Sequence, residues 1–163
     1  MAQMRRRDLA SLNRTPRSLQ RMRLAMPAFR PRYEQLEHTA DLALRIYGRT
    51  LRELFANAAY AMFSQLTDLQ RIALSVQREV EVEGIDYESV LVNWLNELLY
   101  LQDTRGEAYA AFAVHRLSRR RLQATVRGQP TEDIYRIIKG ATYHDLAIEE
   151  TGKGYVVTIV LDV

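Results

Sequence analysis

Two stretches of the chain repeat apolar residues at helical spacing. The first begins at Thr50, where Thr50-Leu-Arg-Glu53 is a capping box, and it ends near Thr67. The second runs from an Asp86 cap to about Gln102. Both stripes predict long amphipathic helices whose inward faces supply about half of the core. The inward residues are Leu51, Leu54, Phe55, Ala58, Ala59, Met62, Phe63 and Leu66 in the first helix and Tyr87, Val90, Leu91, Trp94, Leu95, Leu98 and Leu99 in the second.

Alternation of apolar and polar residues predicts strands around these helices. Residues 75–83 carry valines on one face and mostly Gln or Glu on the other, which predicts a strand with one solvated face. Residues 110–117 and 122–127 are expected to form a hairpin. Thr151-Gly-Lys-Gly154 predicts a tight hairpin before the last strand, its glycines supplying positive φ angles. Without strict βαβ alternation, these elements predict an α+β domain in two layers, with a roughly six-stranded mixed sheet packed against two long helices.

The last predicted strand ends in a cluster of negative charge. Residues 155–161 are almost continuously apolar, and Asp162 follows them directly, beside the terminal carboxylate of Val163. Acidic groups at the end of a strand buried on both faces cost free energy unless water or a cation compensates them. Asp41 immediately precedes another strand pattern, residues 42–47. If the two strands pair in antiparallel fashion, Asp41 and Asp162 meet at one end of a sheet, which favours a hard-cation site.

Other polar residues are candidates for a functional site, but for most of them a purely structural or solvated role is the simpler interpretation. His38 is more often a hydrogen-bonded structural histidine than a ligand or base. His144 and Asp145 could serve a metal or an acid–base site, but solvation in a connecting loop is the simpler interpretation. Lys139 is equally consistent with an exposed lysine and with a contact to phosphate or a partner carboxylate. The arginines 119–121 most simply form a solvated hairpin tip, with RNA contact as the alternative.

Charge and composition divide the chain in two. Residues 1–32 contain nine arginines and one acidic residue, a net charge of +8, whereas residues 33–163 contain 14 basic and 19 acidic residues, a net charge of −5. The first segment lacks apolar periodicity, so we expect a disordered leader: a transit peptide, a nucleic-acid arm, or an extension before an internal start at Met26. The chain has no cysteine, which excludes disulfides and sulfur-bound zinc. Polar residues interrupt its longest apolar stretch, residues 90–101, so no membrane span is predicted.

No phosphate-binding loop, GxSxG or HExxH motif occurs in the sequence. Five segments, in order and over residues 33–163, resemble the archease family: Glu37-His38-Thr39-Ala40-Asp41, residues 48–55, residues 91–101, residues 138–146 and Leu161-Asp162-Val163. The resemblance implies that Asp41, Asp162 and Val163 bind a divalent cation, most often Ca²⁺, with Mn²⁺ or Mg²⁺ as alternatives. It also matches Lys139 to a lysine that is important for activity in some members of the family. Ala43 stands where many members have glycine.

The resemblance further implies an accessory protein and not an enzyme. It implies a cytoplasmic activator of the GTP-dependent RtcB-type RNA ligase that seals tRNA halves in tRNA splicing. On this resemblance we expect the protein to promote guanylylation and turnover of the ligase and to contact tRNA only indirectly. In this interpretation His38, Lys139, His144 and Asp145 face the ligase or support the ligands. Two alternatives stay open: a metal-dependent phosphoesterase that uses the two aspartates with His38 and His144, and an RNA-binding chaperone that acts through the basic leader.

Overall fold

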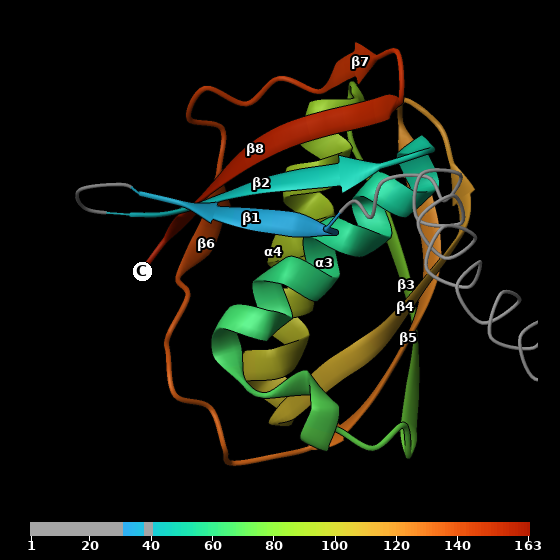
Figure 1. Cartoon of the computed structure of the whole chain (residues 1–163). Helices are drawn as coiled ribbons and strands as arrows, with labels where there is room; N and C mark the ends of the chain where they lie inside the picture. Colours follow the sequence, from blue (N-terminus) through green and yellow to red (C-terminus); the bar gives the residue numbers. More distant parts are fainter. Residues whose placement is uncertain (1–30, 38–40) are drawn as a thin grey trace, which may run out of the picture. The chain divides into compact units, whose positions relative to one another are not determined.

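The computed structural model describes residues 31–37 and 41–163, which belong to one compact unit. Residues 1–30 and 38–40, which include most of the predicted leader and His38, lie outside the described residues. The elements, labelled as in Figure 1, are β1 (Tyr33–Leu36), β2 (Leu42–Gly48), α3 (Leu51–Leu66), the short 3₁₀ turn η1 (Leu69–Arg71), β3 (Val76–Glu83), α4 (Tyr87–Arg105), β4 (Glu107–Leu117), β5 (Arg121–Pro130), β6 (Gly140–Thr142), β7 (Glu149–Thr151) and β8 (Gly154–Asp162).

The strands form two sheets. One has the order β1-β2-β8-β6, with β7 also paired to β8, and the other has the order β3-β5-β4. Every strand pairing in the described residues is antiparallel. The predicted α+β class is therefore confirmed, and the count of roughly six strands in one sheet is approximate, since eight strands divide between two sheets. The sequence missed β1 and β6, which have only four and three residues.

Both predicted helices are confirmed, and local side chains explain their ends. The Thr50 hydroxyl accepts a hydrogen bond from the Glu53 amide at 3.1 Å, and Asp86 and Ser89 form a reciprocal capping box at the start of α4. Helix α4 ends at Arg105 and is capped by Gly106, whose φ of 64° is the left-handed conformation typical of such positions. Within the described ranges, no helix is long and apolar enough to cross a membrane.

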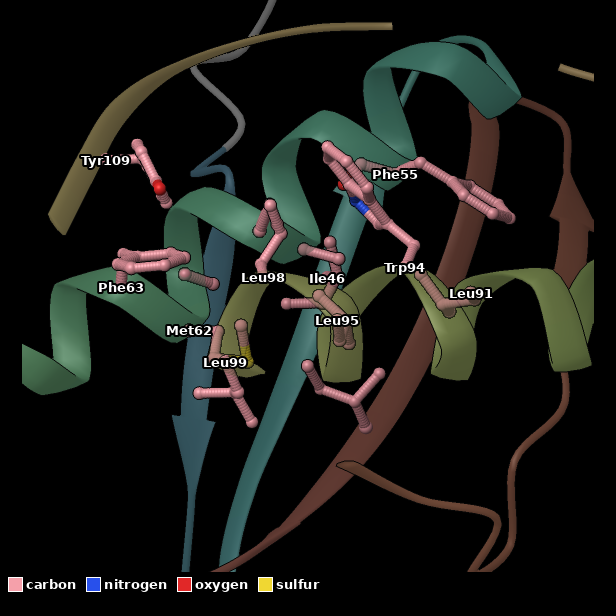
Figure 2. Packing of buried hydrophobic residues seen from close by; sticks show 14 of the residues in the cluster. Ile46, Phe55, Met62, Phe63, Leu91, Trp94, Leu95, Leu98, Leu99 and Tyr109 are labelled. Atoms are coloured by element: carbon pink, nitrogen blue, oxygen red, sulfur yellow. The ribbon is translucent and has the colours of Figure 1, made fainter. Parts of the chain in front are cut away.

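The two helices pack against both sheets and against each other, which places the core around them. Helix α3 contacts β2 and β4, whereas α4 contacts β3 and β6. Figure 2 shows Phe55 of α3 beside Trp94 of α4, and the indole Nε1 of Trp94 donates a hydrogen bond to the Phe55 carbonyl oxygen at 2.9 Å. Because each sheet rests on the same helix pair, the helices fix where the strand ends of both sheets lie.

The predicted hairpin before the last strand is confirmed, with one difference. Strands β7 and β8 pair across a turn of two residues, but only Gly154 has a positive φ, at 132°, whereas Gly152 does not. Gly154 also lies against the backbone of Gly48, where an added Cβ would overlap the Gly48 carbonyl oxygen. This close backbone contact holds the start of β8 against the end of β2 and so helps to set the register between the two strands.

A buried charged cluster joins the outer strands of the smaller sheet. Arg78 on β3 makes two hydrogen bonds to the carboxylate of Glu107 on β4, at 2.6 and 3.1 Å, and the buried Tyr109 hydroxyl donates to the same carboxylate at 2.7 Å. The hydrogen bond from Arg78 lowers the pKa of Glu107, although burial opposes this shift. Burial, and then the hydrogen bond to Glu107, raises the pKa of Tyr109. Glu107 therefore stays charged and Tyr109 neutral near pH 7.

Candidate metal centre

The register between β2 and β8 brings Asp41 and Asp162 to the same end of the larger sheet. Leu42 pairs with Leu161. Asp41 is the residue before Leu42, and Asp162 is the residue after Leu161, so the antiparallel register places the two aspartates opposite each other. Asp41 is half-buried and Asp162 is exposed. Two residues separated by 121 positions in the sequence are therefore neighbours because of the strand pairing.

Both aspartates belong to the face of the sheet that points away from the helices. Side chains alternate between the two faces of a strand. Leu42 and Leu161 are part of the hydrophobic core, so their immediate neighbours Asp41 and Asp162 occupy positions of the opposite face. Arg45, two positions further along the same face of β2 from Ala43, is exposed. Ala43 and Val160, the next positions on this face, are buried, but Asp162 itself is exposed, so a cation could reach its carboxylate from solvent.

Strand β6 brings the backbone of Lys139 to the same sheet end. Gly140 pairs with Asp162, and the Lys139 amide donates a hydrogen bond to the Asp162 carbonyl oxygen at 2.7 Å. The Lys139 side chain is exposed, and Val163, which follows Asp162, is exposed as well. Four of the residues singled out from the sequence, Asp41, Lys139, Asp162 and Val163, thus come from three strand ends that meet.

An asparagine of helix α4 holds β6 in place, and sequence reasoning gave it no role. The Asn96 side chain accepts a hydrogen bond from the Ala141 amide at 2.8 Å and donates one to the Ala141 carbonyl oxygen at 3.4 Å. The Asn96 side chain therefore provides hydrogen-bond partners for both the amide and the carbonyl group of Ala141. The signal in the sequence was an asparagine among the few polar residues of the stretch 90–101, and the structure leaves it half-buried.

His144 and Asp145 lie in a turn that follows β6, as the loop prediction implied. The Leu146 amide donates to the Tyr143 carbonyl oxygen at 3.1 Å, which closes the turn, and Asp145 adopts a φ of 49°. His144 Nε2 is 3.3 Å from Asp145 Oδ2, and both side chains are exposed. Asp145 lines an open cavity of about 440 Å³ together with Arg45, Tyr47 and Thr158, among others.

The side chains of the described residues do not by themselves complete a metal site. In residues 31–37 and 41–163, no three His, Asp or Glu side chains gather closely enough to hold a metal ion. A site at Asp41 and Asp162 would therefore also use main-chain oxygens or water, both of which are common ligands of Ca²⁺. The donors present are all oxygens, so they fit a hard cation and not a metal that prefers nitrogen or sulfur.

The fold and this sheet end define a small α+β protein whose candidate site is an aspartate pair, one residue before β2 and the other at the end of β8. The model of the archease protein family matches residues 33–163. The chain belongs to the archease family. The archease of Methanosarcina mazei is 34% identical over 146 residues, which cover 85% of this chain and 100% of that protein. That of Archaeoglobus fulgidus is 38% identical over 136 residues, which cover 81% of this chain and 99% of that protein.

Two solved structures share the fold. A solution structure of a protein from Methanobacterium thermoautotrophicum has a TM-score of 0.68 and 30% identity, over 81% of this chain and 99% of that one. The crystal structure of an archease from Thermotoga maritima, described there as a possible chaperone, has a TM-score of 0.54 and 25% identity, over 85% of this chain and 99% of that one. The family resemblance noted in the sequence is therefore confirmed.

Proposed function

We propose that this protein is a cation-binding accessory protein that activates a GTP-dependent RtcB-type RNA ligase in tRNA splicing. The observation that carries the proposal is the pairing of Leu42 with Leu161, because it sets Asp41 opposite Asp162 at one end of the sheet. Membership of the archease family supports an accessory role, and the Thermotoga relative's description as a possible chaperone agrees with a protein that acts on another protein.

The cation would be held by the carboxylates of Asp41 and Asp162 and by the main-chain oxygens of Val163. Ca²⁺ suits this set best, because it accepts carboxylate, carbonyl and water oxygens in flexible geometry, whereas Mg²⁺ demands a near-ideal octahedron. Mn²⁺ is the further alternative. When bound, a divalent cation supplies positive charge that orients phosphate oxygens. Lys139 would add a second positive charge beside the cation, since the Lys139 amide is hydrogen-bonded to the Asp162 carbonyl oxygen.

A direct experiment tests the proposed activity. The full-length protein is added to an RtcB-type ligase with GTP and Mn²⁺, and formation of the guanylylated ligase is followed over time. We expect faster guanylylation and more than one ligation per ligase molecule. The protein alone should turn over neither GTP nor RNA, which separates an activator from a phosphoesterase.

A version that lacks residues 1–25 should activate equally, which separates an activator from an RNA chaperone that depends on the basic leader. An unchanged guanylylation rate contradicts the proposal.

Neutralising either aspartate should weaken cation binding while the fold is preserved. Asp41→Asn and Asp162→Asn each replace a charged ligand with a neutral amide of the same shape, and hard cations depend on ligand charge. We expect the affinity for Ca²⁺ in a calorimetric titration to fall at least tenfold in either variant. Glu150→Gln is the matched control, because Glu150 is an exposed acid in the same sheet, on β7. Equal Ca²⁺ affinity in all four proteins would exclude this pair as ligands.

A further inference from the structure

Strand β6 fixes the backbone of Asp162 at the end of the chain. The pairing of β2 with β8 ends at Leu42 and Leu161, whereas the pairing of β6 with β8 continues to Asp162, whose partner is Gly140. The Lys139 amide adds a hydrogen bond to the Asp162 carbonyl oxygen at 2.7 Å. The last residues of a chain are poorly ordered unless their backbone is held. The position of Asp162 therefore depends on β6.

Strand β6 in turn needs support from outside the sheet. It has only three residues and lies at the edge of the larger sheet. Ile138, just before the strand, is buried in the core, and the Thr142 hydroxyl donates to the Val160 carbonyl oxygen at 3.0 Å. Between these two anchors the strand contacts helix α4. Among the hydrogen bonds of residues 31–37 and 41–163, only the two between Asn96 and Ala141 join β6 to a helix.

The chemistry of the Asn96 side chain matches this position. Asn96 is half-buried, and its neighbours Leu95 and Leu98 are fully buried in the core. A side-chain amide has one carbonyl and one NH₂ group, so it can pair with both the amide and the carbonyl group of a single residue such as Ala141. An apolar side chain in its place would leave both groups of Ala141 without these partners, and such a loss weakens the attachment of the strand.

We propose that Asn96 is a positioning residue of the cation site: it fixes β6, and β6 fixes the oxygens of Asp162 and Val163 that would bind the cation. This inference rests on the proposed function, because it concerns the same site. Ligands that are already held in place lose less conformational freedom when an ion binds. Residues that support metal ligands without binding the metal typically change its affinity by about 10–100-fold.

The same helix provides a matched control for Asn96. The side chain of Asn93, one turn earlier on α4, donates a hydrogen bond to the Glu83 carbonyl oxygen of β3 at 2.7 Å. Asn93 therefore joins α4 to the smaller sheet in the same way as Asn96 joins it to the larger sheet. Replacing each asparagine with leucine removes one helix-to-strand attachment, keeps a side chain of similar size and favours the helix. Only the Asn96 change reaches the strand beside Asp162.

Full-length wild type, Asn96→Leu and Asn93→Leu are titrated with Ca²⁺ in a calorimeter. Asn96→Leu should weaken Ca²⁺ binding about tenfold, whereas Asn93→Leu should bind as wild type does. Hydrogen exchange without Ca²⁺ supplies a second measurement: the amides of Lys139 and Ala141 should exchange faster in Asn96→Leu and at the wild-type rate in Asn93→Leu. Melting curves establish that the variants are folded, and Asn96→Ala replaces Asn96→Leu if the leucine variant does not fold.

The possible results separate this inference from the proposed function. If a folded Asn96 variant binds Ca²⁺ as tightly as wild type, Asn96 is not a positioning residue, and the proposed cation site stands. If Asn93→Leu weakens Ca²⁺ binding as much as Asn96→Leu, the effect is general destabilisation and the inference is wrong. If only Asn96→Leu weakens Ca²⁺ binding but the wild type does not activate the ligase, the inference stands and the proposed function is wrong. If wild type binds no Ca²⁺, both are overturned.

Discussion

Replacing Glu107 with alanine is expected to destabilise the protein by about 3 kcal/mol. Removing one partner of a buried ion pair typically costs about 3–5 kcal/mol, because the other charge is left uncompensated. The lower end applies here because the Arg78 side chain is 34% exposed and can recover water. The buried Tyr109 hydroxyl, however, loses its only hydrogen-bond acceptor among the described residues, and such a loss alone costs about 1–3 kcal/mol.

Chemical denaturation of wild type, Glu107→Ala and Glu81→Ala at pH 7 measures this difference. Glu81 is the control because it forms an exposed ion pair with Arg121 on the same small sheet. Exposed pairs contribute about 0–1 kcal/mol, so Glu81→Ala should be nearly neutral. If Glu107→Ala is no more destabilising than Glu81→Ala, the buried cluster does not contribute as its geometry indicates.

The same cluster gives the stability a pH dependence of known sign. Because folding lowers the pKa of Glu107, its contribution is complete above the unfolded-state pKa and is lost as pH falls through the folded-state value. Folding raises the pKa of Tyr109, so that contribution is complete below the unfolded-state value near 10 and is lost at higher pH. The stability gap between wild type and Glu107→Gln should therefore narrow as the pH is lowered below about 4.

The sequence predicted the elements whose periodicity is long enough to be distinctive. Helix α3 and helix α4 span 16 and 19 residues, and their caps at Thr50 and Asp86 are encoded by neighbouring side chains. The convergence of Asp41 and Asp162 could also be predicted from the sequence. One aspartate precedes an apolar strand pattern and the other follows one, so antiparallel pairing of the two strands brings them to the same end. The register of Leu42 with Leu161 gives that arrangement.

What the sequence could not predict depends on contacts between distant segments. A strand of three residues such as β6 carries too little alternation to be recognised, and Asn96 of a different element holds its edge. Glu107 lies outside the strand predicted over residues 110–117, and nothing local indicates that Arg78 lies across β5 from it. The division into two sheets has the same origin, since strand patterns do not specify which strands become neighbours.

Gly128→Ala should be at least as damaging as Glu107→Ala. Gly128 of β5 pairs with Tyr109 of β4, and a Cβ at this position would overlap the carbonyl oxygen and carbon of Ala108. Overpacking by a methyl group usually costs about 1–3 kcal/mol when side chains can move aside. Here the obstacle is backbone, so the strands themselves must separate beside the Arg78–Glu107 cluster. We therefore expect a loss above about 4 kcal/mol, or failure to fold.

Gly152→Ala is the matched control for this substitution. Gly152 is exposed in the β7–β8 turn, its φ is not positive, and an added Cβ would meet nothing within 4 Å. That variant should stay within about 0.5 kcal/mol of wild type, as surface changes usually do. Thermal unfolding and yield of folded protein, measured for both alanine variants, separate a steric effect from the general cost of replacing glycine. If the Gly128→Ala and Gly152→Ala proteins melt at the same temperature, β4 and β5 are further apart at this point, and the Arg78–Glu107 ion pair, which joins β3 to β4 across β5, would then be weaker as well.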